Sequence, residues 1–181
     1  MALAAQSLNV ARKLIDESEL HHRIAQLGEM ISSQYADVDE LILIGILKGS
    51  FVFLSDLTRQ ITVPHMIEFL QVSSYGIGAR ESSGTINLNL DIQTDLTNKH
   101  VLIVEDIIDS GNTLSFIVQH LQRYNPADVA ICTLLDKPSR RQVPVDVAYV
   151  GFEIPDEFIV GYGIDADEQF RHLPYIASAD G

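Results

Sequence analysis

The residues best suited to chemistry lie between an apolar run and the start of a predicted helix. The run Val101-Leu-Ile-Val is followed by Glu105-Asp106, then by Asp109, and then by Ser110-Gly111-Asn112-Thr113. Ligands of open α/β sheets bind beyond the carboxyl ends of the strands. The segment therefore predicts a binding site at the end of a buried strand.

The Ser110-Gly111-Asn112-Thr113 turn has the features of a phosphate-binding loop. Gly111 permits a backbone conformation in which amide groups converge on one point. The N-terminus of the following helix adds further amides and a partial positive charge, and the hydroxyls of Ser110 and Thr113 add donors. The turn is not a Walker loop, because its glycine spacing differs and no lysine precedes Thr113. A triphosphate-hydrolysing role is therefore not predicted.

The three neighbouring acids would repel a bare phosphate, so they need another partner. Glu105 and Asp106 suit a phosphate that carries a sugar, because carboxylates accept hydrogen bonds from vicinal hydroxyls or hold a metal through water. Asp109 would then lie near the bond that is made. Phosphate donors beside diol acceptors predict a site for ribose 5-phosphate. Taken alone, Asp109 and Ser110 also fit an ordinary helix-capping turn.

The elements that must position this segment follow from the hydrophobic pattern. Strands that alternate with helices predict a parallel sheet with right-handed crossovers. Asp16 or Ser18 is placed to cap the first helix, residues 153–177 are turn-rich, and residues 1–15 and 178–181 are expected to be loosely held ends. The predicted helices are 16–34, 51–59 and 113–124, and the predicted strands are 41–47, 66–73, 85–91, 101–105, 128–135 and 146–152.

A stretch rich in glycine and serine begins at Ser74-Tyr75-Gly76 and runs to Gly84, between two predicted strands. Its low apolar content predicts a mobile surface loop. A long loop flanked by two strands is often a lid. A flexible hairpin is the plainer alternative.

Composition narrows the class of protein. The chain has 181 residues, of which 46% are hydrophobic, and this suits one domain. Twelve Lys and Arg against 25 Asp and Glu give a net charge of −13, which disfavours non-specific binding to nucleic acid. No apolar run approaches the ~20 residues of a membrane span, and no signal peptide is visible. A single cysteine, Cys132, fits a reducing compartment. We therefore expect a cytoplasmic protein without a membrane partner.

The segment from residue 101 to residue 114 resembles the phosphoribosyl pyrophosphate (PRPP) signature of the type I phosphoribosyltransferases. From about residue 10 to residue 177, the chain is similar to the bacterial hypoxanthine(-guanine) phosphoribosyltransferases. The resemblance implies the α/β fold of that family, a central mostly parallel sheet flanked by helices with a small hood over the carboxyl ends of the strands. It implies one domain over residues 1–181, with a core of about 35–150 and a hood from the N-terminal segment and residues 151–177.

The resemblance also implies roles for the acidic segment. Asp109 would be the catalytic general base that removes the proton from N7 of the purine. Glu105 and Asp106 would hold the ribose hydroxyls and, with Asp165, a Mg²⁺ cofactor. The expected 5′-phosphate loop consists of Asp109, Ser110, Gly111, Asn112 and Thr113.

Residues elsewhere in the chain match the family's pyrophosphate site and lid. Lys48 and Gly49 would bind pyrophosphate through a loop with a cis Leu47–Lys48 peptide, together with Arg171. The loop that Ser74-Tyr75-Gly76 opens would close over the reaction centre and exclude water.

Three further residues match the family's purine pocket. Lys137 would recognise the exocyclic O6; a lysine only donates, so a 6-oxo group is favoured over a 6-amino group. Phe158 would stack on the base, and the backbone at Ile159 would contact its edge. Arg140 and Arg141 lie close by, and their clustering suggests an anion site or a subunit interface without deciding between them.

The implied reaction belongs to purine salvage. Mg-PRPP and hypoxanthine or guanine would give IMP or GMP and pyrophosphate, through an oxocarbenium-like transition state, in a homo-dimer or homo-tetramer. A preference for xanthine remains open, because contacts to purine C2 cannot be inferred, whereas Lys137 disfavours adenine. A PRPP-sensing regulatory protein would need an electropositive face or an added nucleic-acid-binding module, and the charge of −13 disfavours it.

Overall fold

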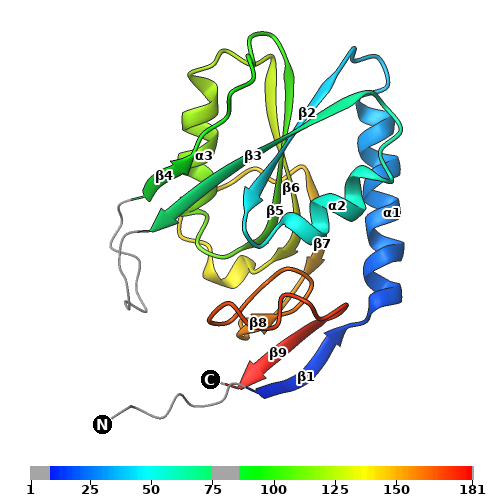
Figure 1. Ribbon diagram of the computed structural model, residues 1–181, viewed down its shortest axis with the longest axis vertical. Helices are drawn as coiled ribbons and strands as arrows, with labels where there is room; N and C mark the ends of the chain where they lie inside the picture. The colour runs from blue at the N-terminus through cyan, green and yellow to red at the C-terminus, as the bar shows by residue number, and fades with distance from the viewer. Residues whose placement is uncertain (1–8, 75–85, 181) are drawn as a thin grey trace.

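The computed structural model describes residues 9–74 and 86–180 and has one large and one small sheet (Figure 1). The large sheet has six strands in the order β4-β3-β2-β5-β6-β7. Every neighbouring pair in it is parallel except β3 and β4 at one edge, which confirms the predicted mostly parallel sheet. The strands are β2 (Leu41–Leu47), β3 (His65–Ser74), β4 (Ile86–Leu90), β5 (His100–Ile108), β6 (Asp128–Asp136) and β7 (Tyr149–Glu153).

Helices cover both faces of this sheet (Figure 1). The helices α1 (Glu17–Gln34) and α2 (Phe51–Thr58) pack on one face, and α3 (Asn112–Gln122) packs on the other. Successive side chains of a strand point to opposite faces. Leu41 and Leu43 of β2 therefore join the apolar cluster under α1 and α2, whereas Ile42 and Ile44 join the cluster under α3. Burial on both faces explains why this strand is apolar throughout.

Helix α1 begins at a capping box formed by Asp16, one of the two predicted capping residues. A side-chain oxygen of Asp16 accepts from the Glu19 N–H at 2.9 Å, and the Glu19 carboxylate accepts from the Asp16 N–H at 2.9 Å. The apolar face that predicted this helix is buried against the sheet. The 3-10 turn η1 (Pro138–Arg140) follows β6.

The small sheet joins the two ends of the described chain. It has the order β1-β9-β8, from β1 (Asn9–Ile15), β8 (Ile159–Val160) and β9 (Ile176–Asp180). Antiparallel pairing of β1 and β9 runs from Asn9 opposite Asp180 to Ile15 opposite Ile176. The prediction of loosely held ends is thus wrong for residues 9–15 and 178–180. The reason is that each strand pairs with a segment at the far end of the sequence.

This small sheet lies beyond the carboxyl ends of the large sheet's strands, where a hood was expected (Figure 1). The segment between β8 and β9 is turn-rich, as predicted. It contains four residues other than glycine with positive φ angles: Tyr162, Asp167, Glu168 and Phe170. No helix within the described ranges has the length and apolar character needed to cross a membrane.

Two element limits bear on the site. Strand β5 continues to Ile108, beyond the predicted end at residue 105, so Asp106 also lies inside the strand rather than after it. Helix α3 begins at Asn112, one residue earlier than predicted.

Candidate active site

The turn between β5 and α3 surrounds a small cavity. Gly111 has a φ of 86°, in the left-handed region that favours glycine, and a Cβ there would lie only 2.6 Å from the Val143 carbonyl oxygen. The amides of the first turn of a helix have no partners within it. The cavity, of about 150 Å³, is lined by Glu105, Ile107, Ile108, Asp109, Ser110, Gly111, Thr113 and Leu114.

A second cavity of about 330 Å³ adjoins the first and shares Ile107 and Asp109 with it. Lys137 lines it and is 4% exposed. Its Nζ donates to the Glu157 carbonyl oxygen at 2.7 Å. The Phe158 side chain is 53% exposed and presents an open aromatic face at the edge of the cavity. The remaining lining residues are Arg140, Asp156, Ile159, Ile164 and Asp165.

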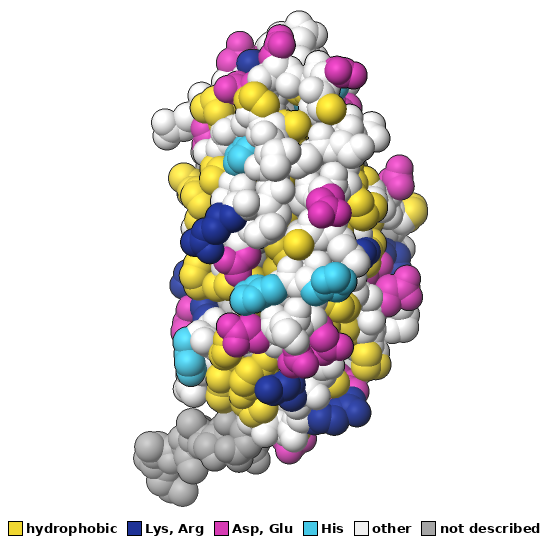
Figure 2. Space-filling model, turned by 90° about the vertical axis from the view of Figure 1, so that its right-hand side faces the viewer, with side chains coloured by type: hydrophobic (Ala, Val, Ile, Leu, Met, Phe, Trp, Pro, Cys, Tyr) yellow, Lys and Arg dark blue, Asp and Glu magenta, His cyan; other side chains and the backbone are white. Residues whose placement is uncertain are grey.

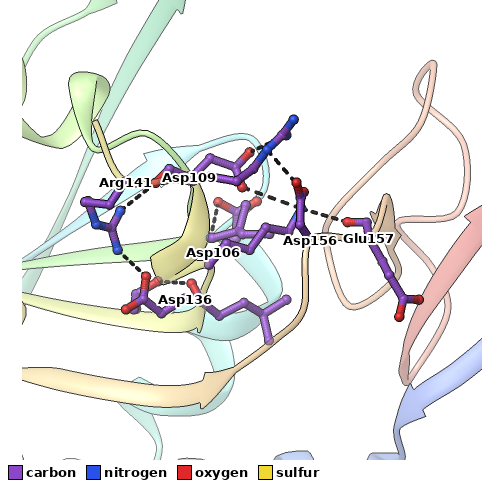
Figure 3. Close-up of polar contacts among 11 residues, drawn as sticks. Asp106, Asp109, Asp136, Arg141, Asp156 and Glu157 are labelled. Carbon is purple, nitrogen blue, oxygen red and sulfur yellow. Dashed lines mark hydrogen bonds and ion pairs between the residues drawn. The ribbon is translucent and has the colours of Figure 1, made fainter. Parts of the chain in front are cut away.

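Asp109 lies between two cations (Figure 3). Its Oδ1 is 3.5 Å from Lys137 Nζ and its Oδ2 is 4.0 Å from Arg140 Nη1. Arg140 also pairs with Asp156 at 3.1 Å. Asp109 Oδ1 is buried without a hydrogen-bond partner among the described residues. Buried polar atoms normally have one, so this oxygen is suited to accept a proton from a bound molecule.

The two acids of β5 have perturbed pKa values. Burial raises the pKa of Glu105 well above its ordinary value, and the nearby charge of Asp106 raises it further. Burial also raises the pKa of Asp106 to about 6, although the Ile107 N–H and the charge of Arg171 act in the opposite direction. Glu105 Oε2 has no hydrogen-bond partner among the described residues. Ligand hydroxyls or a cation would satisfy these carboxylates.

The loop after β2 lies directly against Asp106. The Leu47–Lys48 peptide is cis, as predicted. A Cβ at Gly49 would lie 1.7 Å from Asp106 Oδ2, so only glycine allows this approach. The predicted pyrophosphate loop is thereby placed beside the predicted ribose-binding acids.

Lys48 and Arg171 share one carboxylate. Lys48 Nζ is 2.7 Å from Glu168 Oε1, and Arg171 Nη2 is 3.1 Å from Glu168 Oε2. Arg171 also pairs with Asp165 at 2.8 Å and donates to the Gly163 carbonyl oxygen at 2.8 Å. Two cations predicted to bind an anion therefore face the same point.

The predicted site residues within the described ranges collect at the carboxyl end of the large sheet, next to the hood. They come from the loop after β2, from β5 and the start of α3, from the end of β6, and from the segment between β7 and β9. Ser74 ends β3, whereas Tyr75 and Gly76, and with them the predicted lid, lie outside the described residues.

Sequence reasoning missed several residues at this site. Asp156 and Glu157 line the second cavity, Glu168 bridges Lys48 and Arg171, and Asp136 pairs with Arg141. The only signal was the unassigned pair Arg140-Arg141 close to Lys137, which indicated that acids should lie nearby.

Comparison with known proteins identifies the family of this chain. The family model of the phosphoribosyl transferase domain matches residues 16–167, which is most of the chain. The chain belongs to the phosphoribosyltransferase family.

Individual phosphoribosyltransferases resemble it over nearly its whole length. It is 52% identical over 164 residues to the hypoxanthine phosphoribosyltransferase of Salmonella typhimurium, covering 90% of this chain and 92% of that one. It is 44% identical over 172 residues to the hypoxanthine-guanine phosphoribosyltransferase of Mycobacterium avium, covering 92% and 84%. The crystal structure of a hypoxanthine-guanine phosphoribosyltransferase from Bacillus anthracis superimposes with a TM-score of 0.89 at 44% identity, covering 96% and 100%. The type I phosphoribosyltransferase fold implied by the resemblance is confirmed.

Proposed function

We propose that this phosphoribosyltransferase transfers the 5-phosphoribosyl group from PRPP to hypoxanthine and guanine, giving IMP or GMP and pyrophosphate in purine salvage. One observation carries the proposal: Asp109 is common to two adjoining cavities. One is formed by a phosphate-type loop and the other contains a buried lysine donor and an open aromatic ring. The names of the relatives support the same reaction, as does a similar enzyme from Trypanosoma cruzi whose structure contains its product IMP (38% identity, TM-score 0.86).

In the proposed reaction, the bond from sugar C1 to pyrophosphate breaks and its electron pair leaves with pyrophosphate. The sugar gains oxocarbenium-like character, and a ring nitrogen of the purine attacks C1 from the opposite face. Asp109 removes the N7 proton of the purine as general base. Lys48, Gly49 and Arg171 stabilise the departing pyrophosphate. The ribose hydroxyls bind Glu105 and Asp106, and the 5′-phosphate binds residues 109–113.

A Mg²⁺ ion fits the carboxylates at this site. Glu105 Oε2 has no hydrogen-bond partner among the described residues, and Asp106 lies close enough to interact electrostatically with both Glu105 and Asp165. Within the described ranges no three such groups are arranged to hold a metal by themselves. Mg²⁺ is commonly held by one or two carboxylates with substrate phosphates and water completing its shell. Glu105, Asp106 and Asp165 would hold it, and it would neutralise charge on pyrophosphate.

The purine specificity follows from Lys137. Its ammonium donates to a backbone carbonyl in the unliganded protein, and a 6-oxo group would accept from the same donor. A 6-amino group would not. Phe158 would stack on the base, and Ile159 would contact its edge. We therefore propose hypoxanthine and guanine as substrates, with xanthine as the alternative to be tested beside them.

We also propose a homo-dimer or homo-tetramer in the cytoplasm, without a nucleic-acid partner. Exposed apolar side chains on β3 (Met66, Ile67 and Phe69) and at the start of α2 (Phe51) support self-association. A buried free thiol at Cys132 supports a reducing compartment. Acidic and basic side chains are interspersed on the face in Figure 2, which is unlike a nucleic-acid-binding surface. Light scattering after size exclusion would determine the mass in solution.

The reaction is tested by mixing purified protein with PRPP, Mg²⁺ and each of hypoxanthine, guanine, xanthine and adenine, and measuring the nucleotide formed. IMP or GMP, lost on addition of EDTA, is the expected result. Adenine as the preferred base would contradict the role of Lys137. PRPP binding without product from any base would favour the regulatory alternative.

A further inference from the structure

A short backing segment, residues 141–143, lies directly behind the 109–111 turn. Arg141 Nη1 donates to the Asp109 carbonyl oxygen at 2.7 Å. The backbone N–H groups of Gln142 and Val143 both donate to the Ser110 carbonyl oxygen, at 2.9 and 3.0 Å. Two successive carbonyl groups of the turn are thus directed at the backing segment.

The direction of these carbonyls determines where the turn's amides point. In a planar trans peptide, the C=O and the following N–H point in opposite directions. The Asp109 carbonyl faces Arg141, so the Ser110 N–H points the other way. The Ser110 carbonyl faces Gln142 and Val143, so the Gly111 N–H also points away from the backing segment. The turn itself lines the small cavity, whereas the backing segment lies behind it, so both amides are directed toward the cavity.

Arg141 is held in place by a second contact. Its guanidinium pairs with the carboxylate of Asp136, the last residue of β6 (Figure 3). The Arg141 side chain is 19% exposed and Asp136 is 8% exposed, so the pair is largely shielded from water. A guanidinium presents several donors in a rigid plane and can hold two acceptors in a fixed geometry, whereas the ammonium of lysine is a compact charge with rotatable donors. Arg141 thereby ties the end of β6 to the turn.

We propose that Arg141 is a positioning residue that orients the Ser110 and Gly111 amides for the 5′-phosphate. The proposal rests on the proposed function, because it takes this turn as the phosphate site. Arg141 acts through the Asp109 carbonyl and not by touching the substrate. The Asp136 carboxylate neutralises the charge of Arg141, so Arg141 does not act mainly by attracting the phosphate through its charge.

A merely structural role makes a different prediction. Removing Arg141 leaves the Asp136 carboxylate buried and unpaired, which destabilises the fold whatever the turn does. Stability and phosphate binding must therefore be separated. The double variant Asp136→Asn/Arg141→Ala does this, because it removes the unpaired charge but does not restore the donor to the Asp109 carbonyl.

A matched control is available on α1. Arg23 is also partly buried and donates to two backbone carbonyl oxygens, those of Gly151 at 3.0 Å and Val150 at 2.7 Å. It lines neither cavity of the site. Arg23→Ala should lower the melting temperature without changing PRPP binding.

The experiment measures melting temperature, kcat, the KM for PRPP and for hypoxanthine, and the Kd for ribose 5-phosphate, for Arg141→Lys, Arg141→Ala, the double variant and Arg23→Ala. All assays are run below the melting temperature of each variant. We expect the KM for PRPP and the Kd for ribose 5-phosphate to rise about tenfold in the three Arg141 variants. A change of about this size corresponds to the free energy that a hydrogen bond from a charged donor usually contributes. The KM for hypoxanthine should change less than about twofold, well under the effect expected for PRPP. The double variant should regain stability but not affinity.

The inference is overturned if a folded Arg141→Ala protein binds ribose 5-phosphate as the wild type does, or if the double variant regains wild-type affinity. The ribose 5-phosphate measurement needs no turnover. A wild-type protein that binds ribose 5-phosphate but uses no base would therefore contradict the proposed function, while the variants still decide the role of Arg141. A wild-type protein that does not bind ribose 5-phosphate would overturn both.

Discussion

Asp109 is the residue on which the proposed chemistry depends most directly. It lies where the proposed phosphate and base cavities meet, and it is flanked by Lys137 and Arg140. Asp109→Asn keeps the shape of the side chain and removes the base. We expect kcat to fall by about 10²- to 10⁴-fold, the usual contribution of a general base, while ribose 5-phosphate still binds. Steady-state kinetics on purified variant protein would test this, and unchanged turnover would contradict the assignment.

Asp106 gives the molecule a pH-dependent stability. Burial raises its pKa to about 6 from an ordinary 3.8. Between these values the folded protein holds a proton that the unfolded chain has released, so stability from this group falls as the pH rises through about 6. Asp106→Asn should therefore be more stable than the wild type at pH 8. The advantage should shrink as the pH falls below about 6.

Urea unfolding at pH 8, 6 and 5, without metal or PRPP, would measure that difference. An advantage that is the same at all three pH values would mean that Asp106 does not titrate as described. The variant should also lose catalytic activity at every pH, because a proposed ribose and metal ligand has been removed.

Glu168 occupies the point that Lys48 and Arg171 share, and a pyrophosphate that binds both cations must displace it. Glu168→Gln should therefore lower the inhibition constant of pyrophosphate. The change should be only roughly two- to fivefold, because exposed ion pairs contribute little. Glu40→Gln is a matched control, since it breaks a similar exposed pair with Lys99. An unchanged or higher inhibition constant in Glu168→Gln would show that this pair does not compete with pyrophosphate.

At the scale of elements, the central strands and helices were predictable because their signals are local. Strand β2 is apolar throughout because both its faces are buried, and α1 shows both a capping residue and an apolar face. The pairing of β1 with β9 was not predictable. Their register depends on contacts between opposite ends of the sequence.

The cap of α1 offers a direct test at this scale. Asp16→Ala removes the acceptor for the Glu19 N–H and half of the capping box. The free energy of unfolding should fall, because a side-chain cap at the start of a helix stabilises it, and denaturant titration would measure the change. Glu29→Ala, at an exposed position of the same helix, should change it much less. Equal effects of the two substitutions would mean that the box contributes nothing.

At the scale of the whole molecule, parallel strands explain how much of the site was predictable. Residues that follow such strands meet at one edge, which placed the acidic strand end and the turn after it. The roles of the Lys48-Gly49 loop and of Lys137 came from the family resemblance. The contacts among them were not predictable. The pairs Lys48–Glu168 and Arg141–Asp136 depend on where irregular segments fold back onto the sheet, and no hydrophobic periodicity in the sequence predicts that position.

The hood links base recognition to the end of the described chain. Strand β9 pairs with β8, and the Ala179 N–H donates to the Phe158 carbonyl oxygen at 2.9 Å. Ala177→Asp would place a charge in a fully buried position of β9. We expect the KM for hypoxanthine to rise more than the KM for PRPP. Asp180→Ala, at an exposed position of the same strand, is the control, and equal rises in both KM values would contradict a specific link to the base pocket.

The β1–β9 pairing also has a consequence for the order in which the protein is made. Strand β1 is among the first described segments to leave the ribosome, but its partner is residues 176–180. The large sheet and its helices can assemble while synthesis continues. The hood cannot, because its central strand is translated last. A nascent chain would therefore carry the proposed phosphate site before the proposed base pocket is finished, and purine recognition there could begin only after β9 has been translated.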